Sequence, residues 1–174
     1  MQRRFFSELA TPLGPVTLVS DGARLVSIML LPTIDVVPAN AAWRESDAHL
    51  ATARAQLSAY FDGELREFSL ALAPEGTPFQ QTVWAALRRI PYGATTTYGA
   101  LAASLGVRGA ARAVGSANRL NPLAIVVPCH RVIGSDGRLT GYAGGLERKS
   151  FLLAHEARVL GAAAQLQLEL AASS

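Results

Sequence analysis

A short stretch rich in proline and glycine, residues 73–78 (APEGTP), divides the sequence into two parts of different character. Before it, short apolar runs alternate with turn signals, which is typical of an antiparallel sheet. After it, apolar residues recur at the spacing of one helix face. We therefore predict an α+β protein, with a small N-terminal sheet and helix at residues 1–76 and a mainly helical C-terminal domain at residues 77–174.

The first part predicts a sheet built from hairpins. Asp21-Gly22 stands between two apolar runs, which is a strong signal for a hairpin turn. The further elements expected here are strands within residues 4–31 and at 67–72, a loop over 31–40 with two prolines, and a helix from Ser46 or Asp47 to about Phe61. This order of elements predicts a small antiparallel sheet with one helix.

The second part predicts short helices. Thr77-Pro78 supplies a helix N-cap followed by a proline at the first helical position. The elements expected are helices at 78–90, 97–105, 109–119 and from about Leu146 to Ala157, a strand at 123–128 and a hairpin-like segment at 134–145. The second and third helices, joined by Gly-Val-Arg-Gly, have the spacing of a DNA-binding helix-turn-helix. Two short helices around a glycine turn are, however, more often plain packing.

Charge is distributed unevenly along the chain. Residues 1–76 carry a net charge of −3 and residues 77–160 a net charge of +7, and fifteen of the sixteen basic residues are arginine. Arginine forms forked hydrogen bonds to phosphate. The second part therefore predicts a polyanionic partner, although a preference for arginine also accompanies GC-rich genomes.

The lengths of the apolar runs and the number of cysteines indicate the cellular compartment of the protein. No uncharged apolar run reaches the length of a membrane span, and the N-terminus lacks the pattern of a signal peptide. The single cysteine, Cys129, excludes an internal disulfide and a zinc site built from cysteines. We therefore expect a cytoplasmic protein that needs no metal and no cofactor.

Cys129 follows an apolar run and Pro128, and precedes His130 and Arg131. A lone cysteine is most often an inert core residue, but a thiol beside a base is also a nucleophile. Adjacent side chains on an extended chain point apart, so His130 reaches Cys129 only if the backbone turns or a water bridges them. Glu156, on the last expected helix, is the carboxylate best placed to orient His130. These three residues form a complete relay without an identified electrophile.

The segment around Cys129, IVVPCHRVIGSDGRLTGYAGG at residues 125–145, resembles the active-site segment of the O6-alkylguanine-DNA alkyltransferases, also called methylated-DNA–protein-cysteine methyltransferases. The resemblance continues in order through FQQTVWAALRRIPYGATTTYGALA, GAARAVGSANRLNP and LLAHE, and covers residues 77–157 densely. Before residue 77 it concerns only the general plan of a small sheet with a helix. Within it, Pro-Cys-His-Arg-Val is a specific motif.

The resemblance implies a role for each matching residue. Cys129 accepts the alkyl group from O6 of guanine, His130 takes the thiol proton through water, and Glu156 supports His130. Asn121 braces the turn beside the site, and Tyr98 donates a hydrogen bond to guanine N3. The residues implied in the base pocket are Cys129 and Val132 through their carbonyls, Tyr142 as an aromatic wall, and Ala143 through its backbone N–H. Those implied in DNA contact are Arg112, which replaces the flipped nucleotide in the stack, and Arg119, Thr97, Ala111, Ser116 and Asn118.

The function that the resemblance implies is direct DNA repair by irreversible, stoichiometric alkyl transfer to Cys129, which consumes the protein. The implied partner is alkylated double-stranded DNA, bound in the minor groove with little dependence on sequence, after the damaged base has rotated out of the duplex. We expect a monomer in solution; cooperative assembly on DNA and activity on O4-alkylthymine stay open. Two other functions are a sensor of alkylated guanine without chemistry, and a Cys-His hydrolase of a small substrate.

Overall fold

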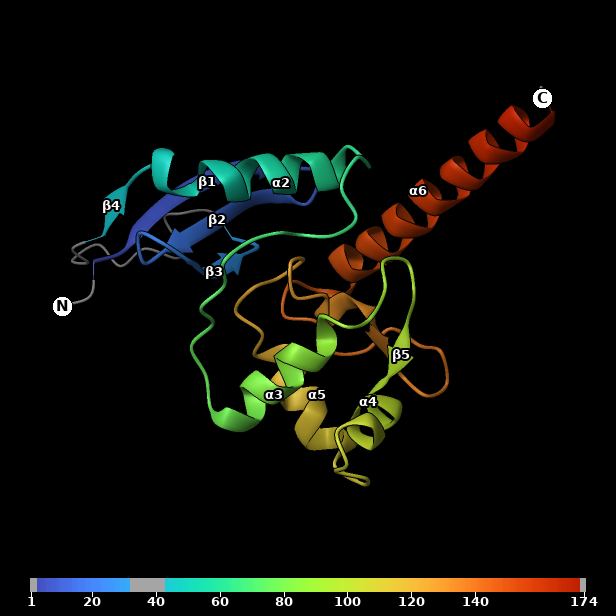
Figure 1. Cartoon of the computed structure of the whole chain (residues 1–174). Helices are drawn as coiled ribbons and strands as arrows, with labels where there is room; N and C mark the ends of the chain where they lie inside the picture. The colour runs from blue at the N-terminus through green and yellow to red at the C-terminus, as the bar shows by residue number, and fades with distance from the viewer. Residues whose placement is uncertain (1–2, 32–42, 173–174) are drawn as a thin grey trace.

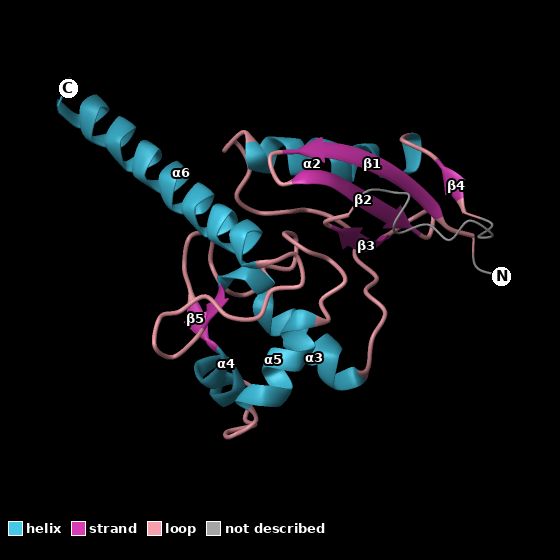
Figure 2. Cartoon of the chain, turned by 180° about the vertical axis from the view of Figure 1, so that it is seen from behind, coloured by secondary structure: helices cyan, strands magenta, loops and turns pink. Residues whose placement is uncertain are grey.

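The computed structural model of the chain describes residues 3–31 and 43–172, with side chains described as far as residue 164. Its elements in chain order are β1 (Phe5–Thr11), β2 (Gly14–Ser20), β3 (Leu25–Met29), β4 (Arg44–Glu45), the 3₁₀ helix η1 (Ala48–Leu50), α2 (Ala51–Phe61), α3 (Pro78–Leu87), β5 (Thr96–Thr97), α4 (Tyr98–Ser104), α5 (Ala111–Arg119), the 3₁₀ helix η2 (Cys129–Arg131), β6 (Val132–Ile133) and α6 (Leu146–Ala172). Figures 1 and 2 show the sheet with α2 in one part, the helices α3, α4 and α5 in the other, and α6 extending outwards. Apart from Leu31, the loop expected over residues 31–40 lies outside the described residues.

The N-terminal sheet is built from two hairpins and has the strand order β3-β2-β1-β4. β1 and β2 pair antiparallel through a tight turn, and Gly14 at the end of this turn has a φ of 95°, which favours glycine. β2 and β3 pair antiparallel through the Asp21-Gly22 turn, where the aspartate carboxylate accepts hydrogen bonds from two backbone N–H groups. The predicted α+β fold, with a small sheet and one helix first, is confirmed.

The strand predicted at residues 67–72 does not form. Leu72 makes an isolated parallel bridge to Leu25 at the edge of the sheet, with two backbone hydrogen bonds of 2.8 and 2.9 Å around Leu25. Pro74 follows almost directly, and it has no N–H with which to continue the pairing. The segment therefore runs beside β3 without becoming a strand of the sheet.

Local signals set the helix starts in the second part of the chain. At the start of α3, the Thr77 hydroxyl accepts from the N–H of Gln80 at 3.3 Å, and the Gln80 side chain accepts from the N–H of Thr77 at 2.7 Å. α3 ends at Leu87, three residues before the predicted end. α4 and α5 lie where the helix-turn-helix spacing was expected, and both glycines of the turn between them, Gly106 and Gly109, have positive φ. α5 packs against both α3 and α4.

The last helix is longer than predicted. α6 runs from Leu146 to Ala172, whereas the prediction ended it at about Ala157. The added turns are rich in alanine and leucine, which are strong helix formers. No helix in the described part of the chain is both long and apolar enough to cross a membrane.

The apolar segment before Cys129 is a turn and not the predicted strand. Leu123 forms a single bridge to Ile28 of β3, and the chain then reverses through backbone hydrogen bonds of 2.8 and 2.9 Å. Ile125 has a φ of 72°, a strained conformation for a β-branched residue. The hairpin predicted at residues 134–145 is also wrong, because this segment is an irregular loop with tight turns. Just before this segment, β6 forms a short parallel pair with β5.

One apolar core joins the two parts of the chain. On β3, the N–H of Ile28 donates to the Pro122 carbonyl at 2.7 Å, and the Ser27 hydroxyl donates to the same carbonyl at 3.0 Å. Between α3 and α5, the indole N–H of Trp84 donates to the Ala117 carbonyl at 2.8 Å. The sheet and α3 therefore both hold the segment that precedes the turn leading to Cys129.

We predict that Trp84→Phe destabilises the protein by about 1–3 kcal/mol, because it leaves the buried Ala117 carbonyl without its donor. The measurement is urea unfolding at neutral pH. Phe79→Leu on the same helix is the control, since Phe79 is 38 % exposed and the change is expected to stay within about 0.5 kcal/mol. Equal stability of Trp84→Phe and the wild type would contradict the link between α3 and α5.

Candidate active site

The Asn121 side chain braces the turn that carries Cys129. Its Nδ2 donates to the Val127 carbonyl at 2.8 Å and to Cys129 Sγ at 3.1 Å. Its Oδ1 accepts from the backbone N–H of Leu123 at 3.0 Å. One amide thus fixes the backbone of the turn and points a donor at the sulfur, which fits the role expected of Asn121.

The backbone turns at Cys129, because this residue begins the 3₁₀ helix η2. The divergence of neighbouring side chains on an extended chain therefore does not apply here. His130 is fully buried, and its Nε2 lies 2.8 Å from Oε1 of Glu156. Its Nδ1 is also buried and has no hydrogen-bond partner among the described residues.

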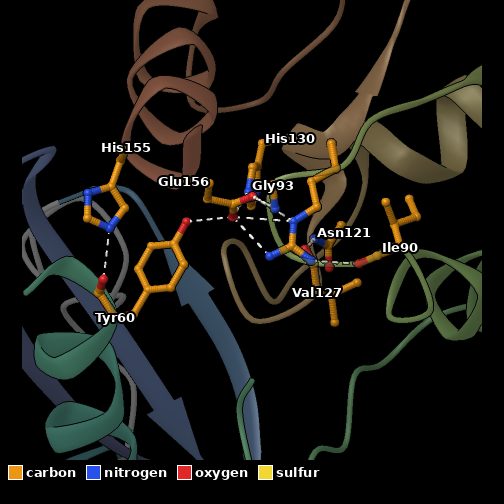
Figure 3. A network of polar contacts seen from close by, with 9 residues as sticks. Tyr60, Ile90, Gly93, Asn121, Val127, His130, His155 and Glu156 are labelled. Carbon is orange, nitrogen blue, oxygen red and sulfur yellow. Dashed lines mark hydrogen bonds and ion pairs between the residues drawn. The ribbon is translucent and has the colours of Figure 1, made fainter. Parts of the chain in front are cut away.

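Glu156 of α6 lies at the centre of a buried network of donors (Figure 3). Its Oε1 accepts from the Tyr60 hydroxyl at 2.8 Å and from Nη2 of Arg131 at 2.9 Å. Its Oε2 accepts from Nε of Arg131 at 3.0 Å and from the N–H of Gly93 at 2.9 Å. Burial acts to raise the pKa of this carboxyl, but the hydrogen bonds from His130 and Arg131 lower it to about 2. Glu156 is therefore an anion at neutral pH.

The anionic carboxylate determines which nitrogen of His130 carries the proton. A carboxylate only accepts hydrogen bonds, so Nε2 is the donor and Nδ1 is the free acceptor. Burial lowers the pKa of His130, and Glu156 opposes this shift only in part. The imidazole is thus neutral, with one unpaired nitrogen able to take a proton.

The thiol of Cys129 is protonated in this resting structure. It is only 5 % exposed, and burial raises its pKa to about 11, although the hydrogen bond from Asn121 and the charge of Lys149 act in the opposite direction. A protonated thiol is a weak nucleophile, so reaction at neutral pH requires a base. His130 is the neighbouring residue that can supply one.

Two buried cations complete the site. Arg131 was named from the sequence only as a neighbour of His130, and Lys149 was given no role. Arg131 pairs with Glu156 and also donates from Nη1 to the Ile90 carbonyl at 2.7 Å. Lys149 is fully buried, and its Nζ donates to the Val132 carbonyl at 2.5 Å and to the Thr140 carbonyl at 2.7 Å. The sequence offers one signal that sets Lys149 apart: it is the single lysine of a chain that has fifteen arginines.

Of the two aromatic residues expected to contact the base, Tyr142 lines a pocket with Cys129, and Tyr98 is not among the described residues that line it. The Tyr98 hydroxyl donates to the Thr140 carbonyl at 3.1 Å, so it must exchange partners before it can donate to a base. The Tyr142 hydroxyl is buried, without a partner in the described part of the chain. Tyr142, Ala143, Asn121 and Cys129 line the same pocket of about 300 Å³. Val132 is fully buried, so only its carbonyl is a candidate contact, and Lys149 already donates to it.

Most of the residues expected to contact DNA lie on α5, and Thr97 lies at the start of α4. Arg112, Ser116 and Arg119 are exposed on α5, and Ala111 is partly exposed at the start of this helix. Thr97 caps α4, where its hydroxyl accepts from the N–H of Ala100 at 3.1 Å.

Asn118 is a correction to the predicted DNA-contact set. It is 1 % exposed, and its Nδ2 donates to the Cys129 carbonyl at 3.3 Å. The rotation of α5 turns it towards the active site and away from solvent. The same bond occupies one acceptor position of the carbonyl that was expected to receive the guanine amino group.

Comparisons with known proteins identify the family. Residues 78–158 match the family model described as 6-O-methylguanine DNA methyltransferase, DNA binding domain, and residues 5–74 match the one described as 6-O-methylguanine DNA methyltransferase, ribonuclease-like domain. The chain is 48 % identical to the methylated-DNA–protein-cysteine methyltransferase of Methanosarcina acetivorans, over 86 % of this chain and 96 % of that one. The chain therefore belongs to the 6-O-methylguanine DNA methyltransferase family, as its motifs predicted.

Solved structures show the same likeness. The crystal structure of Mycobacterium tuberculosis O6-methylguanine methyltransferase matches with a TM-score of 0.81 and 48 % identity, over 88 % of this chain and 92 % of that one. The structure of the Mycobacterium tuberculosis OGT in complex with DNA also matches with a TM-score of 0.81, at 45 % identity, over 90 % and 94 % of the two chains. The fold is thus shared along almost the full length of both proteins.

We predict that Glu156 makes stability fall steeply in acid. Its pKa is depressed in the folded protein, so its stabilisation is complete above the ordinary value of 4.5 and is lost as the pH falls towards about 2. This loss amounts to about 3 kcal/mol. The depressed pKa of His130 acts in the same direction from 6.5 downwards. The measurement is urea unfolding at a series of pH values from 7 to 2.

The matched variants for this test are Glu156→Gln and Glu147→Gln, both on α6. Glu156→Gln should be less stable at neutral pH by about 3–5 kcal/mol, since Arg131 loses its buried partner, and should lose the steep fall between pH 4.5 and 2. Glu147 is exposed, so its variant should follow the wild type. An unchanged acid dependence in Glu156→Gln would show that the network does not hold this carboxylate as an anion.

Proposed function

We propose that this protein repairs DNA directly, by transferring the alkyl group of O6-alkylguanine to Cys129 in a single, irreversible turnover. The observation that carries the proposal is one buried thiol that receives a hydrogen bond from Asn121 and is followed in the chain by the fully buried His130, which pairs with Glu156. Membership of the family supplies the electrophile that the relay alone left unidentified. The activity is that of a methylated-DNA–protein-cysteine S-methyltransferase.

The chemistry requires one proton transfer and one displacement. The thiol proton moves through a bridging water to the free Nδ1 of His130. Glu156 stabilises the imidazolium that results. Cys129 Sγ then bonds to the alkyl carbon while the carbon–O6 bond breaks and its electron pair stays with the guanine. The guanine takes up one proton, aided by a hydrogen bond from Tyr98. Overall, the thiol proton and the alkyl group exchange places, and the thioether that results has no hydrolytic route back.

DNA binding, in this proposal, uses α5 in the minor groove. The exposed face of α5 carries Arg112, Ser116 and Arg119, and its small residues permit close approach to the narrow groove. Arginine contacts to phosphate supply affinity without reading sequence. Insertion of Arg112 into the stack offsets part of the cost of rotating the damaged base out of the duplex. The proposal includes a monomeric protein that acts in the cytoplasm, where it meets DNA.

We predict that a duplex with one radiolabelled O6-methylguanine transfers its label to Cys129 in a burst equal to the protein concentration. Cys129→Ser should take up no label, and His130→Ala should react more slowly by about 10²–10⁴-fold, since it lacks the general base. Mass spectrometry of the peptide that contains Cys129 locates the added methyl group. Repeated turnover would instead support a hydrolase, and protection of cells by Cys129→Ser would support a sensor without chemistry.

We predict that Arg112→Ala slows transfer from duplex DNA by at least about tenfold, because opening the stack costs a few kcal/mol and each 1.4 kcal/mol is a factor of ten. Transfer from the free base O6-benzylguanine, which needs no flipping, should be unaffected by this change. The rates are compared with those of Arg24→Ala, an exposed arginine in the N-terminal hairpin turn. Equal slowing on the duplex and on the free base would refute a flipping role for Arg112.

A further inference from the structure

A second pocket, of about 350 Å³, lies against the turn that leads to Cys129, but Cys129 itself does not line it. Its lining residues come from three stretches of the chain: 66–68 after α2, 88–92 after α3, and 125–131 at the turn. In the described part of the chain, neither α4 nor α5 contributes a lining residue. Small-molecule sites have volumes of about 300–1,000 Å³. The pocket is thus large enough for a small ligand and separate from the helix to which DNA contacts are assigned.

Unpaired arginines dominate this pocket. Arg66, Arg88 and Arg89 line it and are exposed, and none of their side chains forms a hydrogen bond or an ion pair with another described residue. The single carboxylate that lines the pocket, Glu67, also pairs with none of the described arginines. Three positive charges and one negative charge leave a net charge of +2. Because like charges that face a common space repel one another, an anion between them is favoured.

A fourth arginine of the pocket, Arg131, is buried and already paired. It forms an ion pair with Glu156, and its Nη1 donates to the Ile90 carbonyl at 2.7 Å. Its guanidinium also lies 5.5 Å from the centre of the Tyr92 ring. Arg131 is therefore a fixed wall of the pocket, whereas the three exposed arginines are free to turn towards a ligand.

Tyr92 adds an unused donor beside these charges. It lines the pocket, and its hydroxyl is buried without a hydrogen-bond partner among the described residues. Burial raises the pKa of this hydroxyl, although the charge of Arg66 acts in the opposite direction. The hydroxyl is therefore protonated at neutral pH and is able to donate to an oxyanion.

The helix dipole accounts for only part of this cluster. Arg88 and Arg89 follow the last residue of α3, where basic side chains are favoured by the negative end of the helix. Arg66 lies in the segment after α2, in the first part of the chain, and has no such reason to be there. The convergence of all three side chains on one pocket is therefore left to a different cause.

We propose that this pocket binds the phosphate group of a small molecule, with Arg66, Arg88 and Arg89 as its ligands. Arginine binds phosphate oxygens through forked hydrogen bonds, and a phosphate dianion matches the net charge of +2. Since Arg66 belongs to the first part of the chain and the other two to the second, a bound phosphate links the two parts. This site goes beyond the proposed function, because neither Cys129 nor α5 takes part in it.

The test measures the binding of inorganic phosphate by isothermal titration calorimetry at neutral pH, with sodium chloride keeping the ionic strength constant. One phosphate should bind per chain and should raise the melting temperature in a saturable way, because it binds only the folded state. The double variant Arg88→Gln/Arg89→Gln should bind phosphate at least about tenfold more weakly, since it loses charge-assisted hydrogen bonds. Arg66→Gln, which leaves α3 unchanged, should weaken binding as well.

The matched control is the double variant Arg108→Gln/Arg138→Gln. It removes the same two charges from exposed arginines that do not line the pocket, so it should bind phosphate as the wild type does. Equal weakening in the two double variants would reduce the effect to net charge and would overturn the site. So would a wild type without saturable phosphate binding. Loss of stability in Arg88→Gln/Arg89→Gln with unchanged phosphate binding would assign these arginines to the helix dipole alone.

A second measurement decides whether the phosphate belongs to a small molecule or to the DNA backbone. The affinity for an undamaged duplex is measured over a range of salt concentrations, because each phosphate contact contributes about one to the slope. With a small-molecule site, Arg88→Gln/Arg89→Gln keeps the slope of the wild type. A slope smaller by about two would place DNA phosphates at these arginines and would overturn the small-molecule site.

Discussion

The buried carboxylate of Glu156 is the constraint on which the rest of the site depends. An anion without contact to water costs several kcal/mol unless it is paired and fully hydrogen-bonded. Its donors are four residues from three parts of the chain: Tyr60 on α2, Gly93 before β5, and His130 and Arg131 on η2. The hydrogen bonds that this one charge requires therefore fix α6 against α2, against the loop before β5 and against the segment that carries Cys129.

The same network joins stability to chemistry. Tyr60 belongs to the N-terminal part, and its hydroxyl donates to the carboxylate that pairs with His130. His155, the residue before Glu156, donates to the Tyr60 backbone carbonyl at 2.8 Å and holds α6 and α2 together a second time (Figure 3). The N-terminal part is thus a structural support of the active site, and through β3 it also forms a wall of the pocket that Cys129 lines.

Much of this fold and part of the site could be predicted from the sequence, because the residues that determine them act on neighbouring parts of the chain. The Asp21-Gly22 turn and the Thr77 cap act through neighbouring backbone groups, so sequence alone places them. The segment 123–128 was predicted wrongly, since a short apolar run does not distinguish a buried strand from a buried turn. Asn118 was assigned to DNA contact through the resemblance, but only packing shows which face of α5 it occupies. Lys149 gains its importance from burial, which no local signal reveals.

In the resting structure the Cys129 thiol is in its protonated, weakly nucleophilic form. Burial raises the pKa of the Cys129 thiol and lowers that of His130, so both groups are neutral at rest. A thiolate–imidazolium pair is costly in this setting, but Asn121, Lys149 and Glu156 already face the charges that would form. Because these three side chains are already in position, they need not reorganise when the charges form. If Cys129 is used once, as the proposed function holds, this arrangement protects it, because a permanent thiolate would react with any electrophile that reached it.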